Sequence, residues 1–548
     1  MKNFPSYLVL LFLLMTGQGI SQTAQILTRQ DSLRRMITPE RAWWDLTFYD
    51  LAAEFDYDKK FMRGSNTITF DVIAPHHVMQ IDLQEPLKIT KAEYKGKPLP
   101  YKREGNVYWI TFPQPLLKNV GEKIKVYYEG NPIEAVRPPW DGGITWAKDP
   151  NGLPFIASSC QGLGASAWWP CKEHMYDEVD SMLIRITTPP SFTDASNGRL
   201  RQIEYHPDGG RTWHWFVSNP INNYGVNVNI AKYAHWTDTI HGEKGALDLD
   251  FYVLEDHYDT ARLHFEDVYK TLRAFEHWFG PYPFYNDGYK LIEVPYLGME
   301  HQSSVTYGNQ FKKGYLGRDL SKSGWGLKWD FIIVHETAHE WWANSITYKD
   351  IEDMWIHESF ANYAESLFLD YHYGRQAANE YAIGTRINIE NRSPIIGSPY
   401  HDPDSRDMYY KGGNMLHTLR TSLNDDVLFR NVLRGLQKDF YHQTVTSSDI
   451  EQYMSKATGR DLDPFFDQYL RDIRVPVFEY LIKGKTVRYR FNNIVTGFRM
   501  PVQISVNGGE KIWVTPGEKW LELKQAAPIV SVQLDPNYYI LTKQLTKK

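Results

Sequence analysis

Cysteine is almost absent from the 548-residue sequence, which contains only Cys160 and Cys171. Two cysteines can form at most one disulfide bond, so a secreted scaffold stabilised by many disulfides is excluded. The pair either forms one bridge, which would add little to the stability of so large a protein, or remains as two buried free thiols. The sequence alone leaves both alternatives open.

Long hydrophobic runs are equally scarce, and the clearest one lies at the N-terminus, in MKNFPSYLVLLFLLMTGQGISQTAQ. Lys2 precedes the apolar residues 7–15 and small polar residues follow them, which is typical of a secretory signal peptide. The run is too short to cross a bilayer. We therefore expect a signal peptide over residues 1–21, cut after Ser21. The mature protein is expected to be exported, to the periplasm or the extracellular medium, with no transmembrane segment.

Neither strong charge nor low sequence complexity marks the chain. Its net charge is only -6, so nothing indicates a nucleic-acid partner. The residues are 42% hydrophobic and 23% charged, as in globular proteins, and the length suggests about three or four domains. Aromatic residues make up 15% of the sequence. They either fill β-rich cores or form a stacking surface for glycans or peptide side chains. Oligomeric state has no signal in the sequence.

The hydrophobic pattern divides the remaining chain into three parts. Residues 22–255 contain alternating segments such as TITFDV, EKIKVYY and RTWHWFV, which predict a mostly antiparallel β domain. Residues 256–474 are mainly helical in pattern. Residues 475–548 alternate again, with a hairpin turn at Asn507-Gly508, and are a candidate small β-sandwich. In the helical part, apolar residues recur at steps of three to five residues from His257 to Phe279, which predicts a helix that ends at Gly280-Pro281. This apolar stripe is formed by Leu263, Val268, Leu272, Phe275 and Phe279.

The helical part contains the segment VHETAHEWW at residues 334–342. Residues four apart lie on one face of a helix, so His335 and His339 can offer two imidazole nitrogens to one metal ion. Glu336 lies beside them, next to any water on that ion. The plain alternative is an ordinary amphipathic helix that carries charged turns.

A catalytic zinc site needs a third protein ligand and one open position. The segment DMWIHESFANYAESLFLDYHYG offers Glu358, with 18 residues between it and His339. This gap allows the first helix to end and a second helix, capped by Asp353 and closed by Gly374, to lie alongside. We predict one Zn²⁺ per chain, held by His335, His339 and Glu358.

At this point the chain resembles the zinc aminopeptidase family of aminopeptidase N and leukotriene hydrolase, a family of gluzincin metallopeptidases. HETAHEWW and WIHESFANYAE resemble its zinc-binding segments, and MYYKGGNMLHTLR resembles the segment with its catalytic tyrosine. FGPYPFYNDGYKLIEVPYLGMEHQ resembles its exopeptidase strand, and SSCQGLGASAWWPCKE resembles its N-terminal substrate loop. The resemblance implies a multidomain α+β fold with a β-saddle domain, a thermolysin-like catalytic domain and a small β-sandwich.

The resemblance also implies roles for single residues in the hydrolysis of the N-terminal bond of peptides. Glu336 would act as general base, and Tyr409 would donate a hydrogen bond to the oxyanion. Glu300 and Gln161 would bind the free α-amine, and Gly298 would let the substrate backbone approach as an added strand. Tyr410 competes with Tyr409 for its role.

Four positions depart from the family pattern. Leu297 and His301 stand where the exopeptidase motif usually has glycine and asparagine, and His357 and Ser359 flank Glu358 where asparagine and glycine are usual. These changes bear on specificity more than on chemistry, and we expect His301 and His357 to serve structural hydrogen bonding. Glu365, seven residues after Glu358, either holds a zinc-ligand histidine or is a surface acid. A zinc endopeptidase on the same scaffold and an inactive peptide- or glycan-binding relative remain the alternative functions.

Overall fold

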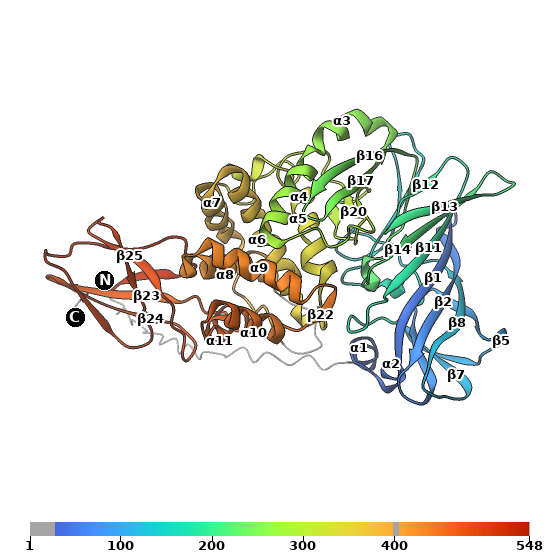
Figure 1. Ribbon diagram of the computed structural model, residues 1–548, viewed down its shortest axis with the longest axis horizontal. Coiled ribbons are helices and arrows are strands. Elements are labelled where there is room, and N and C mark those ends of the chain that lie inside the picture. Colours follow the sequence, from blue (N-terminus) through green and yellow to red (C-terminus); the bar gives the residue numbers. More distant parts are fainter. Residues whose placement is uncertain (1–27, 398–404, 547–548) are drawn as a thin grey trace, which may run out of the picture.

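The computed structural model of the protein describes residues 28–397 and 405–546. The expected signal peptide, residues 1–21, lies outside the described residues. Figure 1 shows an elongated molecule with N-terminal strands at one end, helices in the middle and a small group of strands at the other end. The architecture is therefore multidomain and mixed α/β. None of the described helices is both long and apolar enough to cross a membrane.

The N-terminal part consists mainly of β-sheets whose inward residues follow the alternating pattern. Ile68 and Phe70 of one strand, Ile124 and Val126 of another, and Trp215 are all buried. An eight-stranded sheet has the order β13-β14-β11-β1-β2-β8-β4-β5. Its strands are β1 (Trp44–Asp56), β2 (Phe61–Val72), β4 (Lys88–Tyr94), β5 (Lys97–Pro98), β8 (Asn119–Gly130), β11 (Ser181–Thr188), β13 (Arg199–Tyr205) and β14 (Arg211–Val217).

Two smaller sheets and two short helices complete this part. One sheet has the order β3-β7-β6 and the other β12-β15-β10-β9. Their strands are β3 (His76–Asp82), β6 (Tyr101–Glu104), β7 (Val107–Leu116), β9 (Gly143–Lys148), β10 (Pro154–Ser159), β12 (Thr193–Asp194) and β15 (Asn229–Ala231), and the helices are α1 (Arg29–Arg35) and α2 (Pro39–Ala42). Cys160 and Cys171 are both buried free thiols, so the second of the two alternatives holds.

A five-stranded sheet of order β16-β17-β18-β20-β19 joins the N-terminal part to the helices. It contains β16 (Tyr233–Gly242), β17 (Gly245–Leu254), β18 (Tyr289–Glu293), β19 (Gly298–Met299) and β20 (Val305–Tyr307). Strands from both sides of residue 255 share this sheet, so the change of pattern there marks the start of helices within one continuous structure. Strand β19 lies at the edge and pairs only with β20, in antiparallel register.

The middle of the molecule is built around α6, whose side chains are buried continuously from Trp355 to Leu369. A helix buried on all sides must carry its polar residues in pairs or networks. The helices are α3 (Tyr258–His264), α4 (Glu266–Phe279), α5 (Phe331–Ala338), α6 (Trp355–Tyr373), α7 (Arg375–Thr385), α8 (Asp407–Leu423), α9 (Asp426–Asp439), α10 (Ser447–Thr458) and α11 (Asp463–Leu470). Strands β21 (Ile346–Tyr348) and β22 (Gln443–Val445) pair in parallel.

Two helical expectations were wrong in detail. The stripe between residues 257 and 279 is interrupted at Phe265 between α3 and α4, and Leu263 on α3 is 81% exposed. The N-cap of α6 is Met354, because the carboxylate of Asp353 instead accepts a hydrogen bond from Ser447. The helix does end at Gly374 as expected.

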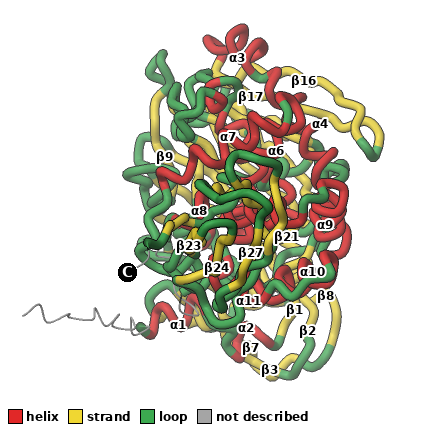
Figure 2. Tube along the Cα trace, turned by 90° about the vertical axis from the view of Figure 1, so that its left-hand side faces the viewer, coloured by secondary structure: helices red, strands yellow, loops and turns green. Residues whose placement is uncertain are grey.

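The C-terminal part forms two sheets, β27-β24-β23-β29 and β26-β25-β28. Asn507 and Gly508 both have positive φ and form the expected hairpin turn between β25 and β26. Figure 2 shows strands β23, β24 and β27 in front of the helices. The strands are β23 (Val477–Lys483), β24 (Thr486–Asn492), β25 (Val502–Val506), β26 (Lys511–Val514), β27 (Leu521–Lys524), β28 (Val532–Leu534) and β29 (Leu541–Gln544).

Candidate metal centre and active site

Helix α5 presents the histidine pair. Its N-cap is Asp330, whose carboxylate accepts a hydrogen bond from the Ile333 N–H at 3.1 Å. The other carboxylate oxygen accepts from His264 at 2.6 Å and Tyr307 at 2.9 Å, so the start of the helix is fixed. One turn apart on the same face, the rings of His335 and His339 lie with centroids 5.0 Å apart.

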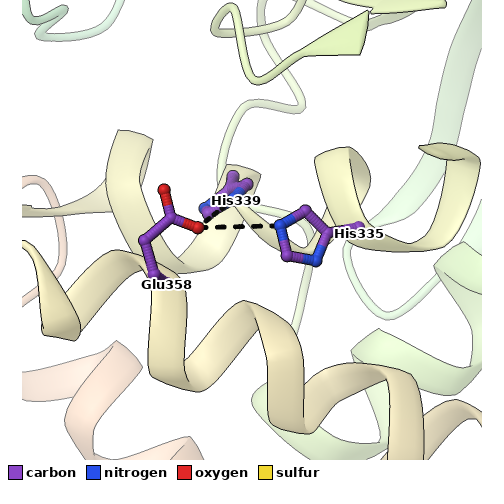
Figure 3. A group of neighbouring side chains, drawn as sticks. All are labelled: His335, His339 and Glu358. Atoms are coloured by element: carbon purple, nitrogen blue, oxygen red, sulfur yellow. Dashed lines mark ion pairs between the residues drawn. The ribbon is translucent and has the colours of Figure 1, made fainter. Parts of the chain in front are cut away.

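Three side chains from two helices converge at this point (Figure 3). Glu358 Oε2 on α6 lies 3.6 Å from Nε2 of His335 and 3.5 Å from Nε2 of His339. One donor atom from each residue lies within 4.8 Å of the other two, and no other such group of three His, Cys, Asp or Glu occurs among the described residues. Glu358 Oε2 is buried without a hydrogen-bond donor from the described part of the chain. Two imidazole nitrogens and an unpartnered carboxylate oxygen are the donor set that a divalent ion such as zinc requires.

The far nitrogen of each imidazole is held by an acceptor. His335 Nδ1 lies 2.9 Å from Glu365 Oε1, and His339 Nδ1 lies 3.1 Å from the Trp342 carbonyl oxygen. Because both partners only accept, each Nδ1 carries a proton, and Nε2 is the nitrogen of each ring that is left to bind a metal. Glu365 is fully buried and also accepts from the Tyr381 hydroxyl at 2.7 Å, so it is not a surface acid.

The Trp342 carbonyl reaches His339 because the backbone leaves the helical conformation there. Trp342 has φ -117° and ψ 60°, and the indole ring stacks on Phe360 of α6 with centroids 4.1 Å apart. Neither this carbonyl nor Tyr381 was identified from the sequence. A carbonyl leaves no residue-type signal, and Tyr381 lies on a different helix at no diagnostic spacing.

Glu336 lies next to His335 on α5, and its carboxylate accepts no hydrogen bond from the described residues. Burial raises the pKa of this carboxyl to about 7, with the His335 ring lowering it and Glu358 raising it. For Glu358, burial alone would raise the pKa, but the neighbouring His339 and His335 bring it to about 2. Glu358 is thus held in its charged form, and Glu336 is able to exchange a proton near neutral pH.

Tyr409 lies in the first turn of α8, with its ring centroid 6.2 Å from that of His335. Burial, together with the nearby carboxylates of Glu358 and Glu300, raises the pKa of this phenol well above its usual value, so it keeps its proton. Tyr409 lines the cavity at the metal donors, whereas Tyr410 does not.

Two glycines that the sequence reasoning passed over let α8 lie close to α6. A Cβ on Gly412 would lie 2.6 Å from the Ser359 Cβ, and a Cβ on Gly413 would lie 2.2 Å from the Asn362 Oδ1. The pair Gly412-Gly413 follows Tyr409 by one helical turn, so this close packing sets the position of the tyrosine.

Glu300 follows edge strand β19 and is buried with two donors. Gln161 Nε2 donates to Glu300 Oε1 at 2.5 Å and to Glu358 Oε1 at 3.1 Å, and the Tyr224 hydroxyl donates to Glu300 Oε1 at 3.2 Å. Burial and the charges of Glu336 and Glu358 raise the pKa of Glu300 well above its usual value. Gln161 therefore links the carboxylate of Glu300 to the metal-binding carboxylate, while Tyr224 is a further contact that the sequence did not suggest.

His357 and His301, the two histidines at positions that depart from the family pattern, make hydrogen-bond contacts inside the protein. His357 Nε2 accepts from the Tyr348 N–H at 2.9 Å, and its Nδ1 lies 3.4 Å from the Tyr224 hydroxyl. His301 Nδ1 lies 3.4 Å from Thr306 Oγ1. Burial lowers the pKa of both rings, so both are neutral at physiological pH.

Gly298 on β19 faces α5 directly. A Cβ there would lie 2.5 Å from Ile332 Cγ2 and 3.5 Å from Glu336 Cγ. The glycine therefore lets the edge strand approach the helix that carries the histidine pair.

A cavity of about 370 Å³ lies at the metal donors. It lies between the N-terminal sheets and the helices, with Trp140 and Leu297 at one side. The residues expected from the sequence to form a site all line it, namely Gln161, Gly298, Glu300, His335, Glu336, His339, Glu358 and Tyr409.

The central part of the chain is similar to a family of known proteins. Residues 263–469 match the family model described as the peptidase family M1 domain. Endoplasmic reticulum aminopeptidase 1 of Homo sapiens is 24% identical over 377 residues, which cover 66% of this chain and 38% of that protein. Leucyl aminopeptidase of Saccharolobus solfataricus is 25% identical over 489 residues, covering 84% and 58%. The chain thus spans less than two thirds of the length of these relatives.

Solved structures share the fold. A mutant form of the M1 zinc metallopeptidase from Deinococcus radiodurans superimposes with a TM-score of 0.66 at 18% identity, over 80% of this chain and 96% of that chain. The same protein bound to a Tyr-Ser-Ala substrate gives a TM-score of 0.65 at 19% identity, over 80% and 96%.

Proposed function

Residues 263–469 carry a peptidase family M1 domain, and on this premise we propose that the protein is a zinc aminopeptidase that removes the first residue of peptides. The observation that carries the proposal is the convergence of His335 Nε2, His339 Nε2 and the unpartnered Glu358 Oε2 beside the carboxylate of Glu336. The oxygen and nitrogen donors suit zinc, and three protein ligands leave one position open. One ion is bound per chain.

When bound, zinc polarises the scissile carbonyl as a Lewis acid and lowers the pKa of water to about 7. Glu336 accepts the proton of the attacking water and transfers it to the leaving amine. A carboxyl with a pKa of about 7 is matched to both halves of this transfer near neutral pH. Tyr409 keeps its proton and donates a hydrogen bond to the oxyanion of the substrate.

Glu300 limits cleavage to the first residue. A peptide α-amine has a pKa near 8 and is largely cationic at neutral pH. This cation pairs with the buried Glu300 carboxylate, and its charge lowers the raised pKa of Glu300. Gln161 holds Glu300 in place and accepts a hydrogen bond from the amine through its amide oxygen. Only one residue then fits between the amine-binding carboxylate and the metal donors.

The substrate backbone binds along the free edge of β19. Among the described strands, β19 pairs with β20 on one side, and its residues Gly298 and Met299 line the cavity at the metal donors. An extended peptide adds to such an edge as a further strand.

The proposal includes the layout and location of the protein. Residues 22–255 correspond to a β-saddle domain, residues 256–474 to a thermolysin-like catalytic domain and residues 475–548 to a β-sandwich. The strands at both ends of the molecule and the helices between them support this layout. A signal peptide of residues 1–21 directs the protein to the periplasm or the extracellular medium, where peptides are its substrates.

The central test is the substitution Glu336→Gln. We expect zinc, measured by elemental analysis, to stay bound at one per chain, while turnover of an aminoacyl amide falls by about two orders of magnitude or more. Full activity of this variant would remove the base assignment.

N-acetylated peptides separate the proposal from its alternatives. Hydrolysis of acetylated peptides at internal bonds would establish an endopeptidase, and zinc-loaded protein that cleaves no peptide would be an inactive relative.

A further inference from the structure

A second cavity of about 570 Å³ adjoins the one at the metal donors. Trp140 and Leu297 line both cavities, so they stand at the junction between the two. We propose that this second cavity binds a large apolar or aromatic side chain of the substrate, located two or three residues beyond the cleaved bond. The inference rests on the proposed aminopeptidase function and specifies its substrates.

Three charged or titratable groups around the second cavity, His257, Glu293 and Asp149, already have hydrogen-bond partners within the protein. His257 Nδ1 lies 2.6 Å from Glu293 Oε1, and Glu293 Oε2 accepts from the Leu254 N–H at 2.9 Å. Asp149 Oδ1 accepts from the N–H groups of Asn151 and Leu153 at 2.9 and 2.8 Å. A ligand therefore finds few free polar partners there.

Apart from Lys148 and Gln310, the remaining walls are apolar or aromatic. Leu316, Phe311 and Pro150 line the second cavity but not the first, as do Phe155 and Tyr296. The Tyr296 hydroxyl is used in a hydrogen bond to the Ser158 carbonyl oxygen at 2.7 Å, so the ring presents its apolar face. Trp140, at the junction, leaves 68% of its surface exposed. Removing such surfaces from water is the main favourable contribution that this cavity offers a ligand.

The direction of the substrate follows from strand β19 and Glu300. The amine is held by Glu300, at the C-terminal end of the edge strand, while Leu297 lies at its N-terminal end. A peptide that adds to this edge therefore runs antiparallel to β19, from residue 300 toward residue 297. At about 3.3 Å per residue, the third residue of the peptide lies opposite Leu297. Because successive side chains of a strand point to opposite faces, one of the third and fourth side chains reaches the second cavity.

The occupant is therefore the downstream part of the same peptide. The two cavities share a wall, the strand edge leads from one to the other, and the apolar lining matches Phe, Tyr, Leu or Trp. Short substrates, such as dipeptides and aminoacyl amides, leave the second cavity empty.

Binding of tetrapeptide amides to the zinc-loaded Glu336→Gln variant tests the inference without hydrolysis. The probes are Leu-Ala-Ala-Ala amide and its three relatives with Phe at position two, three or four, titrated by calorimetry. We expect Phe at position three or four to tighten binding about tenfold over Ala. Equal affinities of all four, or a gain at position two alone, would overturn the inference.

A charge placed in the second cavity provides a matched comparison. Leu316 has φ 50°, a conformation that aspartate tolerates, so Leu316→Asp introduces a carboxylate without new backbone strain. In the Glu336→Gln background it should abolish the preference for Phe, whereas Leu263→Asp, on the exposed face of α3, should retain it. A preference that survives Leu316→Asp would contradict the inference.

Hydrolysis by the unsubstituted enzyme is read separately. If it cleaves neither a leucyl reporter nor any tetrapeptide, the proposed function fails, while a Phe preference in binding still supports the second cavity as a peptide site. If it cleaves the reporter and the binding series is flat, the function stands and the inference fails.

Discussion

Three buried glutamates, Glu358, Glu336 and Glu300, line the cavity at the metal donors, and their environments differ. Glu358 is held in its charged form by His339 and His335, which keep its pKa at about 2. Burial raises the pKa of Glu336 to about 7 and that of Glu300 well above its usual value. A divalent cation and a substrate ammonium group each favour the charged forms of such carboxyls. The site therefore favours positive charge at two places: at the metal donors and, in the proposed function, at the substrate amine.

In the proposed function, Glu300→Ala removes the partner of the substrate amine. Losing one member of a buried charge pair costs about 3 kcal/mol, so kcat/KM on a leucyl amide should fall roughly a hundredfold. The matched substrate is the 2-hydroxy acid analogue, in which a hydroxyl replaces the amine and carries no charge. Its kcat/KM should change little in the variant. An equal loss on both substrates would mean that Glu300 supports the fold of the site and not the amine.

Glu365→Ala removes the acceptor that holds His335 Nδ1. Such outer partners typically contribute 10- to 100-fold to metal affinity, and we expect a loss of about that size. Competition with a chelator measures it. Glu365→Gln is the matched control, because its amide oxygen can still accept from Nδ1 and should restore most of the affinity. Unchanged affinity in the alanine variant would leave Glu365 as a packing residue only.

At the scale of elements, the helices that carry the metal donors were predictable because their signals are local. Residues four apart share a helix face, and Gly374 ends α6 as its position suggested. The contacts of Tyr224 and Tyr381 were not predictable, because they join segments far apart in sequence with no spacing rule. The break at Phe265 was hidden because apolar steps of three to five residues continue across it.

Helix α8 depends on Gly412 for its distance from α6. In Gly412→Ala the new methyl group would overlap the Ser359 side chain, whose Cβ would lie 2.6 Å away. Overpacking of this kind costs about 1–3 kcal/mol. We expect a lower melting temperature and a lower kcat, because a shift of α8 moves Tyr409 away from the substrate.

Gly435→Ala in α9 is the matched control for this substitution. Its Cβ would lie 2.1 Å from the hydroxyl oxygen and 3.2 Å from Cζ of Tyr453, at the far end of a half-buried side chain that can move aside. Alanine also favours a helix over glycine by about 1 kcal/mol. This variant should keep the kcat of the wild type. Equal losses in both variants would show that the effect of Gly412→Ala is not specific to the contact between α8 and α6.

At the scale of the whole molecule, the site is complete only when separate parts of the chain are docked. Gln161 and Tyr224 come from the N-terminal part, Glu300 from the shared sheet, and the metal donors and Tyr409 from the helices. The C-terminal sheets dock on the other side of α8. Arg386 donates to the carbonyl oxygens of Pro536 and Asn537 at 2.7 and 3.0 Å, and the Tyr539 N–H donates to Thr418 Oγ1 at 2.9 Å.

His417 on α8 makes this docking sensitive to acid. Its Nε2 lies 3.1 Å from Asn537 Oδ1, and its Nδ1 lies 3.2 Å from the Tyr363 hydroxyl. The amide oxygen can only accept, so Nε2 carries the proton and Nδ1 accepts from Tyr363. A second proton on the ring would place a positive charge inside the protein, and Nδ1 could then no longer accept from Tyr363. Burial accordingly lowers the pKa of His417 to about 3.

The sign of the pH dependence follows from this shift. The unfolded chain binds a proton at His417 near pH 6.5, before the folded chain does, so this residue's contribution is intact above pH 6.5 and is lost as the pH falls toward 3. Between pH 7 and pH 5 the loss amounts to about 2 kcal/mol. His417→Gln lacks the titrating ring. It should be less stable than the wild type at pH 7 and should lose less stability on acidification, as measured by urea midpoints at each pH.

His241→Gln, at an exposed position at the end of β16, is the control and should follow the wild type at every pH. If the wild type and His417→Gln lose the same amount of stability on acidification, other groups are responsible for the pH dependence. If the difference in stability between the wild type and His417→Gln narrows with falling pH as expected, His417 joins α8 to the C-terminal sheets only while it is neutral. Because α8 also carries Tyr409, acid that loosens this contact should lower kcat before the protein unfolds globally, and kcat followed over the same pH range in both proteins tests this coupling.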